Sequence, residues 1–171
     1  MNNSRESKLL QLAFLTAAAS SIHIVESLIM RVLPLPFLRI GLSNVVVLYL
    51  IYKNQTWEAI VVNIGKSLLG GLATLTLLTP ATFLSLMGGF CAIVVMLLLR
   101  WLKMGLSIYG ISICGAITHN LTQLALVYVF IIKNVRVFVL TPLLLSIALV
   151  SGSLIAYITL YADTKFKLPN I

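Results

Sequence analysis

The stretch Gly115–Gln123, GAITHNLTQ, lies near the middle of an apolar run that extends from Leu106 to Ile132. That run is long enough to cross a bilayer as a helix with some tilt. At about 100° per residue, Gly115, His119 and Gln123 share one face of the helix. Because polar side chains find no water in the lipid core, this face must point toward other helices or a cavity.

Two interpretations of this polar face remain open from the residues alone. Thr, Asn, Gln and His side chains within spans often form hydrogen bonds that tie neighbouring helices together. The same side chains, here Thr118, His119, Asn120, Thr122 and Gln123, are also suited to the floor of a binding pocket.

Composition places the chain in a membrane. Of 171 residues, 60% are hydrophobic and only 9% are charged, and the mean hydropathy is +1.09. Soluble domains carry about 25% charged residues. We therefore expect an all-α integral membrane protein that forms a single domain over residues 1–171. Cys91 and Cys114 each lie within a predicted span, which argues against a secreted disulfide framework.

The apolar runs predict a bundle of six transmembrane helices. The second helix is short, because twelve residues rise only about 18 Å against a hydrocarbon core of roughly 30 Å. It follows the apolar, proline-stiffened loop RVLPLPFLRI, which we interpret as a lid that fills the missing depth and places Arg39 and Asn44 inside the protein. The expected helices cover about residues 9–30, 41–52, 57–78, 82–102, 106–132 and 137–161.

The third predicted helix carries a cation close to its middle. Asn63, Lys66 and Gly70 occupy one face, which we expect to point inward because a charge is expensive in lipid. Lys66 is then either a buried positive charge for a ligand or a structural tie. Glycine pairs in this helix and the next indicate close helix crossings.

The first predicted helix combines small residues with an acid. Ala13, Ala17 and Ser21 recur at four-residue spacing, a pattern that permits close approach of another helix and also occurs in ordinary packing. His23 and Glu26 lie in the far half. An acid within a span favours a functional role, although pairing with a basic group near the membrane surface also accounts for Glu26.

Basic residues predict the orientation. With the N-terminus inside, seven Lys and Arg residues lie inside and four outside, which favours two cytoplasmic termini. The outer residues would attract an anionic ligand or meet lipid phosphates. These four are Arg31, Arg39, Lys133 and Arg136.

Motifs for catalysis are absent from the sequence. There is no Walker motif, no Gly-x-Ser-x-Gly and no histidine- or cysteine-rich metal site. The four acids, Glu6, Glu26, Glu58 and Asp163, are scattered, so no pair is spaced to hold Mg²⁺ on a diphosphate. We expect no enzyme activity, no catalytic residue, no metal, no cofactor and no nucleic-acid partner.

Four motifs together resemble a known family. The segments PLPFLRIGLSN, KSLLGG, SLMGG and GAITHNLTQL look like the Gx transporter family, also labelled heptaprenyl diphosphate synthase component I. That family is similar to the substrate-binding S components of energy-coupling factor (ECF) transporters of the bacterial cell membrane. The resemblance implies six helices, inside termini and an outward-facing pocket.

The resemblance also implies functional residues and partners. A stripe at Ala13, Ala17 and Ser21 would dock onto a transmembrane coupling protein driven by two ATPase subunits. The substrate would be a small anionic or isoprenoid-like solute. Its expected binding residues are Arg39, Asn44, Lys66, His119, Asn120 and Gln123.

Two other functions fit the same residues. The alternative family label suggests a non-catalytic membrane subunit of a polyprenyl diphosphate synthase, whose active site would lie on a partner. A scaffold subunit of a quinone-related membrane redox complex would use the polar groups only as ties between helices.

Overall fold

The computed structural model describes residues 2–30 and 40–166, with side chains over 6–30 and 40–165. These residues form six α-helices and no strand, which confirms the predicted all-α class and helix count. The helices are α1 (Asn2–Met30), α2 (Asn44–Tyr52), α3 (Thr56–Ala73), α4 (Pro80–Trp101), α5 (Ile108–Val127) and α6 (Thr141–Phe166). A π-helical turn, η1 (Tyr128–Ile132), and a 3-10 helix, η2 (Val135–Leu140), connect α5 to α6.

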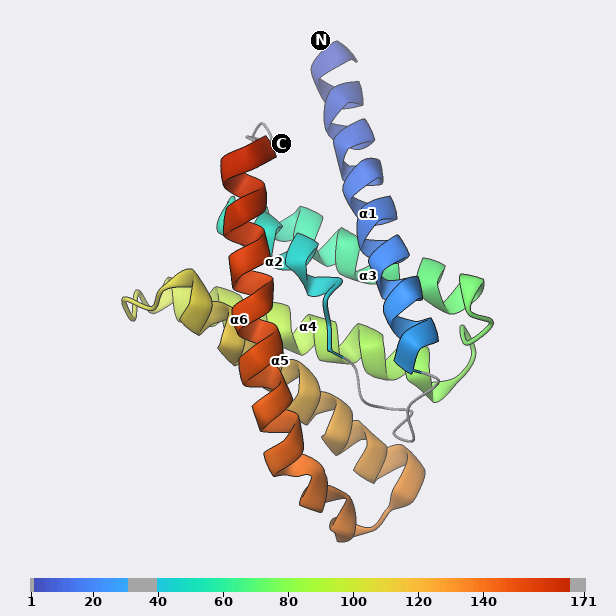
Figure 1. Cartoon of the computed structure of the whole chain (residues 1–171). Helices are drawn as coiled ribbons and strands as arrows, with labels where there is room; N and C mark the ends of the chain where they lie inside the picture. Colours follow the sequence, from blue (N-terminus) through green and yellow to red (C-terminus); the bar gives the residue numbers. More distant parts are fainter. Residues whose placement is uncertain (1, 31–39, 167–171) are drawn as a thin grey trace.

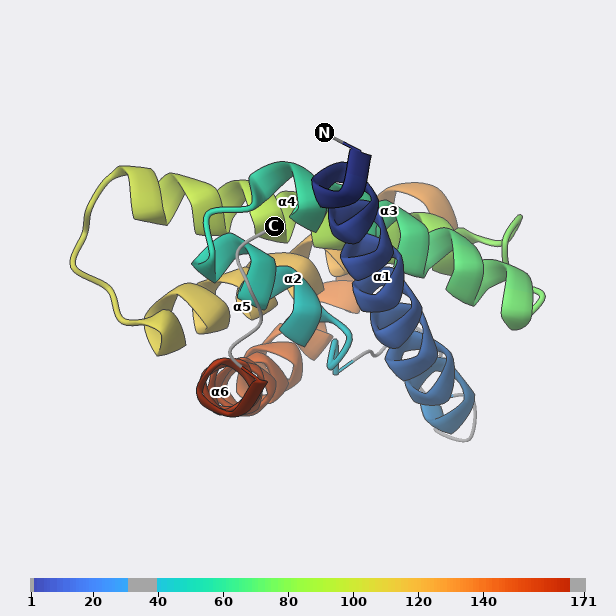
Figure 2. The same ribbon diagram turned by 90° about the horizontal axis from the view of Figure 1, so that it is seen from above.

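The helices cross rather than stand in parallel. Figure 1 shows that α1 begins and α6 ends at the same end of the molecule. In Figure 2 α6 is seen along its axis, whereas α4 lies across the view in both figures. Packing is most extensive between α4 and α5, between α5 and α6, and between α1 and α3. The polar face of α5 therefore lies between two neighbouring helices.

Four helical segments are long and apolar enough to cross a membrane. They are Glu6–Met30, Pro80–Trp101, Ile108–Ile132 and Val135–Lys165. Helix α2 is shorter, with nine residues, and α3 carries Glu58 and Lys66. Many large apolar side chains on the long helices are exposed, among them Phe14, Phe130 and Val150, as expected of surfaces that face lipid. The chain is therefore a multi-pass membrane protein.

Helix α2 is short and enclosed by other helices. Its residues from Val46 to Ile51 are all buried, and it packs mainly against α3 and α6. A helix that is apolar on every side belongs in a protein interior. It begins at Asn44, later than the predicted residue 41, because Gly41 adopts φ +79° and its carbonyl oxygen accepts a 2.8 Å hydrogen bond from the Asn44 N–H.

Helix α3 ends at Ala73, before the predicted residue 78. Leu75 is left-handed at φ 56°, and its N–H donates to the carbonyl of Leu72 at 3.1 Å. The Thr76 N–H donates to the carbonyl of Gly71 at 2.7 Å. This pair of bonds is a Schellman motif, which closes a helix and is normally built on glycine rather than leucine.

The helical run predicted over 106–132 is also divided. Ser107 caps α5, since its Oγ accepts from the Gly110 N–H at 3.4 Å. Helix α5 gives way to η1 after Val127, and Lys133 is left-handed at φ 48°. Helix α6 begins at Thr141 with Pro142 in its first turn, where proline is tolerated, so the expected start at 137 falls within η2.

One end of the bundle is joined by charged side chains. Lys53 Nζ lies 2.6 Å from Asp163 Oδ1, which links the end of α2 to α6. The hydrogen bond to the Asp163 carboxylate raises the pKa of the Lys53 ammonium. Arg100 donates to the carbonyl of Ile51 and, at 2.7 Å, to Asn54 Oδ1, so α4 is held at the same turn.

The predicted glycine pairs of α3 and α4 lie at close helix crossings, because Cβ atoms on Gly70 and Gly89 would meet side chains of α1 and α3. An unpaired glycine, Gly152, provides a closer backbone contact. A Cβ atom on Gly152 of α6 would lie 2.7 Å from the backbone Cα of Ile113 in α5. Beside this contact, Ser112 Oγ donates to the Gly152 carbonyl at 2.7 Å. Backbone cannot rotate away as a side chain can, so this crossing requires glycine.

A Gly152→Ala variant is therefore expected to lose about 1–3 kcal/mol of unfolding free energy through overpacking. Thermal or denaturant unfolding of the protein in detergent measures the loss. Gly110→Ala is the matched control, because a Cβ atom there would meet nothing closer than 3.4 Å. Equal stability of the two variants would contradict the assigned crossing.

Candidate functional site

The predicted polar site residues face the interior of the protein. Lys66 is 1% exposed, and His119, Asn120 and Gln123 are buried as well. Asn44 is half-buried at the first position of α2. Arg39 lies outside the described residues. The described polar groups avoid the lipid-facing surface, which is a condition of both the pocket and the tie interpretations.

Lys66 joins α3 to the start of α2. Its Nζ donates to Asn44 Oδ1 and, at 3.4 Å, to Ser43 Oγ. A buried ammonium needs such acceptors, because an ion without them is strongly destabilising in an apolar interior. Helices α2 and α3 are therefore tied by a charged hydrogen-bond network.

The polar face of α5 reaches both α4 and α6. His119 Nε2 and Gln123 Nε2 lie 3.1 Å apart on successive turns. Both pack against Gly88 of α4, where a Cβ atom would lie 3.1 Å from His119 Cε1 and 3.2 Å from Gln123 Cγ. Asn120 Nδ2 donates to the Leu144 carbonyl of α6 at 3.2 Å. Asn120 thus ties two helices in this conformation.

A small cavity lies among α2, α4, α5 and α6. Its walls include Asn44, Gly89, Ser112 and Gly115, and it measures about 10 Å³. That volume is close to what one water molecule needs. His119, Asn120 and Gln123 do not line this cavity. An organic ligand therefore requires these helices to separate.

Asn63 is a further buried polar residue of α3, although the predicted site omits it. It is buried on α3, and its Nδ2 donates to the Leu86 carbonyl of α4 at 3.2 Å. Its Oδ1 has no hydrogen-bond partner within the described part of the chain. The signal in the sequence is its position three residues before Lys66, which places both on one helix face.

The small-residue stripe on α1 is uncovered. Ala13, Ala17 and Ser21 are all exposed, and Ser21 Oγ donates to the Ala17 carbonyl at 2.9 Å. The opposite face of α1 is occupied, because Thr16 and His23 lie where Cβ atoms on two glycines of α3 would sit. The stripe thus presents small side chains to the surroundings, with the one hydroxyl satisfied inside its own helix.

Within residues 2–30 and 40–166, no group of three or more His, Cys, Asp or Glu side chains is placed to hold a metal ion. Glu26 is buried on α1 and accepts a hydrogen bond from the Gly41 N–H. This contact was not expected from the sequence, because it depends on where the chain returns after α1.

Comparison with protein families gives one match. The family described as heptaprenyl diphosphate synthase component I matches residues 15–162. The matched region begins within α1 and ends near the end of α6. It therefore contains the predicted polar site residues of α2, α3 and α5, and it contains Ala17 and Ser21 of the stripe. Neither the curated proteins nor the solved structures gave a significant match.

Proposed function

The chain belongs to the heptaprenyl diphosphate synthase component I family, and on that premise we propose that it is the substrate-binding membrane subunit of an ECF-type importer. In this role the protein captures a solute from outside the cell and uses the ATPases of partner subunits to import it. It catalyses no reaction and holds no cofactor of its own.

The exposed stripe on α1 is the observation that carries this proposal. A membrane helix with small residues on its free face allows a second helix backbone to approach closely. Ala13, Ala17 and Ser21 form such a face, and no described helix of this chain covers it. The proposed occupant is the transmembrane coupling protein, which carries two ATPase subunits. The protein would then reside in the bacterial cell membrane with both termini in the cytoplasm.

The buried polar group supplies the proposed substrate site. Lys66 provides a positive charge suited to an anionic group, and Asn44 holds its ammonium in place. His119, Asn120 and Gln123 provide hydrogen bonds from α5. Arg39, which lies outside the described residues, is the remaining residue of the proposed site. An isoprenoid-like body would suit the surrounding apolar helices. Because the cavity beside Asn44 is small, substrate entry requires α2 and α5 to separate.

Native mass spectrometry of the purified protein tests substrate binding. We expect an anionic or isoprenoid-like solute to remain bound to the wild type. Gln123→Leu should weaken its binding by about ten- to one-hundred-fold, since a polar ligand would lose a buried hydrogen-bond partner. Leu121→Val is the control, because Leu121 is an exposed residue of α5 outside the proposed site and should leave binding unchanged. Unchanged solute binding by Gln123→Leu would indicate that the polar side chains of α5 only tie helices together.

The second candidate is an accessory membrane subunit of a polyprenyl diphosphate synthase. The family description favours it. The described residues offer no acidic cluster for the metal ions of a diphosphate, so the active site would belong to a partner. Recovery of the protein with a soluble prenyl synthase would favour this function. A scaffold role would instead leave the protein without a bound solute.

A further inference from the structure

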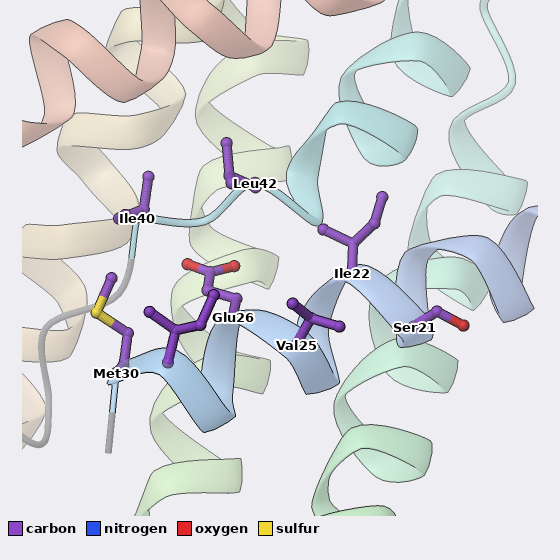
Figure 3. Close-up of a pocket in the computed structure, with 8 residues that line it drawn as sticks. Ser21, Ile22, Val25, Glu26, Met30, Ile40 and Leu42 are labelled. Carbon is purple, nitrogen blue, oxygen red and sulfur yellow. The ribbon is translucent and has the colours of Figure 1, made fainter. Parts of the chain in front are cut away.

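An apolar groove lies along the second half of α1, away from the polar group of α5. It is closed on one side by residues 40–42 and measures about 310 Å³, at the lower end of the range for small-molecule pockets. Figure 3 shows Ile22, Val25 and Met30 of α1 facing Ile40 and Leu42. Val25 and Ile29 are 56% and 59% exposed, so the groove is open to its surroundings.

One acidic residue, Glu26, lines this groove, whose other lining residues are apolar apart from Ser21. Its side chain is 5% exposed, and its carboxylate lies between α1 and the Ile40–Leu42 segment (Figure 3). Oε1 accepts a hydrogen bond from the Gly41 N–H, while Oε2 has no hydrogen-bond partner among the residues that the structure describes. A buried carboxylate oxygen without a hydrogen-bond partner is costly within a membrane helix, which favours a functional role for Glu26.

A hydrogen-bond network at the start of α2 holds the Glu26 carboxylate in place. Gly41, which donates to Glu26, accepts the Asn44 N–H at 2.8 Å, and Asn44 in turn accepts from Lys66. The bond to Gly41 therefore belongs to the network that fixes the start of α2. A ligand that reaches Oε2 would meet a positioned acceptor rather than a mobile side chain, which lowers the entropy lost on binding.

We propose that this groove binds a ligand with a compact apolar body and a cationic nitrogen, which donates a hydrogen bond to Glu26 Oε2. The apolar walls accept the body, and the carboxylate selects the positive charge over a neutral or negative group. Asn44, Lys66, His119, Asn120 and Gln123 do not line the groove. The lining of the groove thus differs from that of the proposed substrate site, although the bond to Gly41 links Glu26 to Asn44. At one end the groove shares Ser21 with the small-residue stripe of α1. The proposal does not require that the protein serve an importer.

Three probes of matched shape test the charge preference. They are cyclohexylmethylammonium, cyclohexylmethanol and cyclohexanecarboxylate, each titrated against the full chain in detergent with the thermal unfolding midpoint as readout. Only the ammonium is expected to raise the midpoint of the wild type. Glu26→Gln keeps an acceptor for Gly41 and should weaken ammonium binding by about ten- to one-hundred-fold. Glu58→Gln, in the first turn of α3, is the control and should bind as the wild type does.

A second variant tests the groove by filling it. Ile22→Trp should abolish ammonium binding, whereas Leu28→Trp should not, because Leu28 is exposed on α1 but does not line the groove. Ile22 is itself partly exposed, so this test remains if Glu26→Gln fails to fold. The proposal is overturned if the alcohol stabilises as well as the ammonium. It is equally overturned if folded Glu26→Gln or Ile22→Trp binds the ammonium with wild-type affinity.

Discussion

Asn44→Leu is expected to destabilise the protein by about 3 kcal/mol, because it removes an acceptor from a buried ammonium. Lys66 is enclosed between α2 and α3, and Asn44 Oδ1 is one of the groups that receive its hydrogen bonds. The substitution keeps the charge of Lys66 but replaces the Asn44 acceptor by a leucine side chain, which cannot accept a hydrogen bond. Equilibrium unfolding in detergent measures the change.

The double variant Lys66→Met/Asn44→Leu is the decisive companion. Replacing both members of a buried polar pair by apolar groups of similar size is often nearly neutral, so the double variant should recover most of the lost stability. Lys66→Met alone should lose an intermediate amount, about 1–3 kcal/mol, since neutral acceptors are left behind. Additive losses in the double variant would show that Lys66 and Asn44 do not act as a pair.

Ala17→Leu is expected to abolish solute import while leaving solute binding intact. Ala17 lies in the middle of the exposed stripe on α1, where a larger side chain would hold a partner helix away. It does not line the cavity beside Asn44, so the substrate site should be unaffected. ATP-dependent uptake by proteoliposomes that contain all four subunits measures import, and native mass spectrometry measures binding.

Ala125→Leu is the matched control for this variant. Ala125 is also exposed on a long apolar helix, α5, but lies outside the stripe. Its replacement should leave both import and binding at wild-type levels. Full import by Ala17→Leu would show that α1 does not dock through this stripe, and loss of import in both variants would point to a general effect of bulk on the membrane-facing surface.

Periodicity explains why the main features of the fold could be predicted. The inward position of Lys66 and of the α5 polar face follows from the cost of placing such groups in lipid, and burial of these side chains agrees with it. The spacing of Ala13, Ala17 and Ser21 predicts a stripe of small residues on α1, which the structure leaves exposed. That such a stripe faces a partner rather than this chain's own helices was an expectation from the family resemblance. What these residues bind is a further question that periodicity does not address.

Local backbone geometry and long-range contacts were harder to predict from the sequence. The early end of α3 depends on a left-handed leucine, Leu75, where a glycine would have given the signal. The π-helical turn after Val127 has no comparable marker in the sequence. The bond from Gly41 to Glu26 and the pairing of Asn44 with Lys66 join separate elements, so no pattern within one helix predicts them.

The proposed role of this protein is to bind solute for an importer energised by partner subunits. Purification of the tagged full chain from its native membrane under mild detergent, followed by mass spectrometry of the intact complex, tests it most directly. We predict a complex with one membrane coupling protein and two ATPase subunits, which Ala17→Leu disrupts and Ala125→Leu preserves. A complex with a soluble polyprenyl diphosphate synthase and without ATPase subunits would contradict the claim.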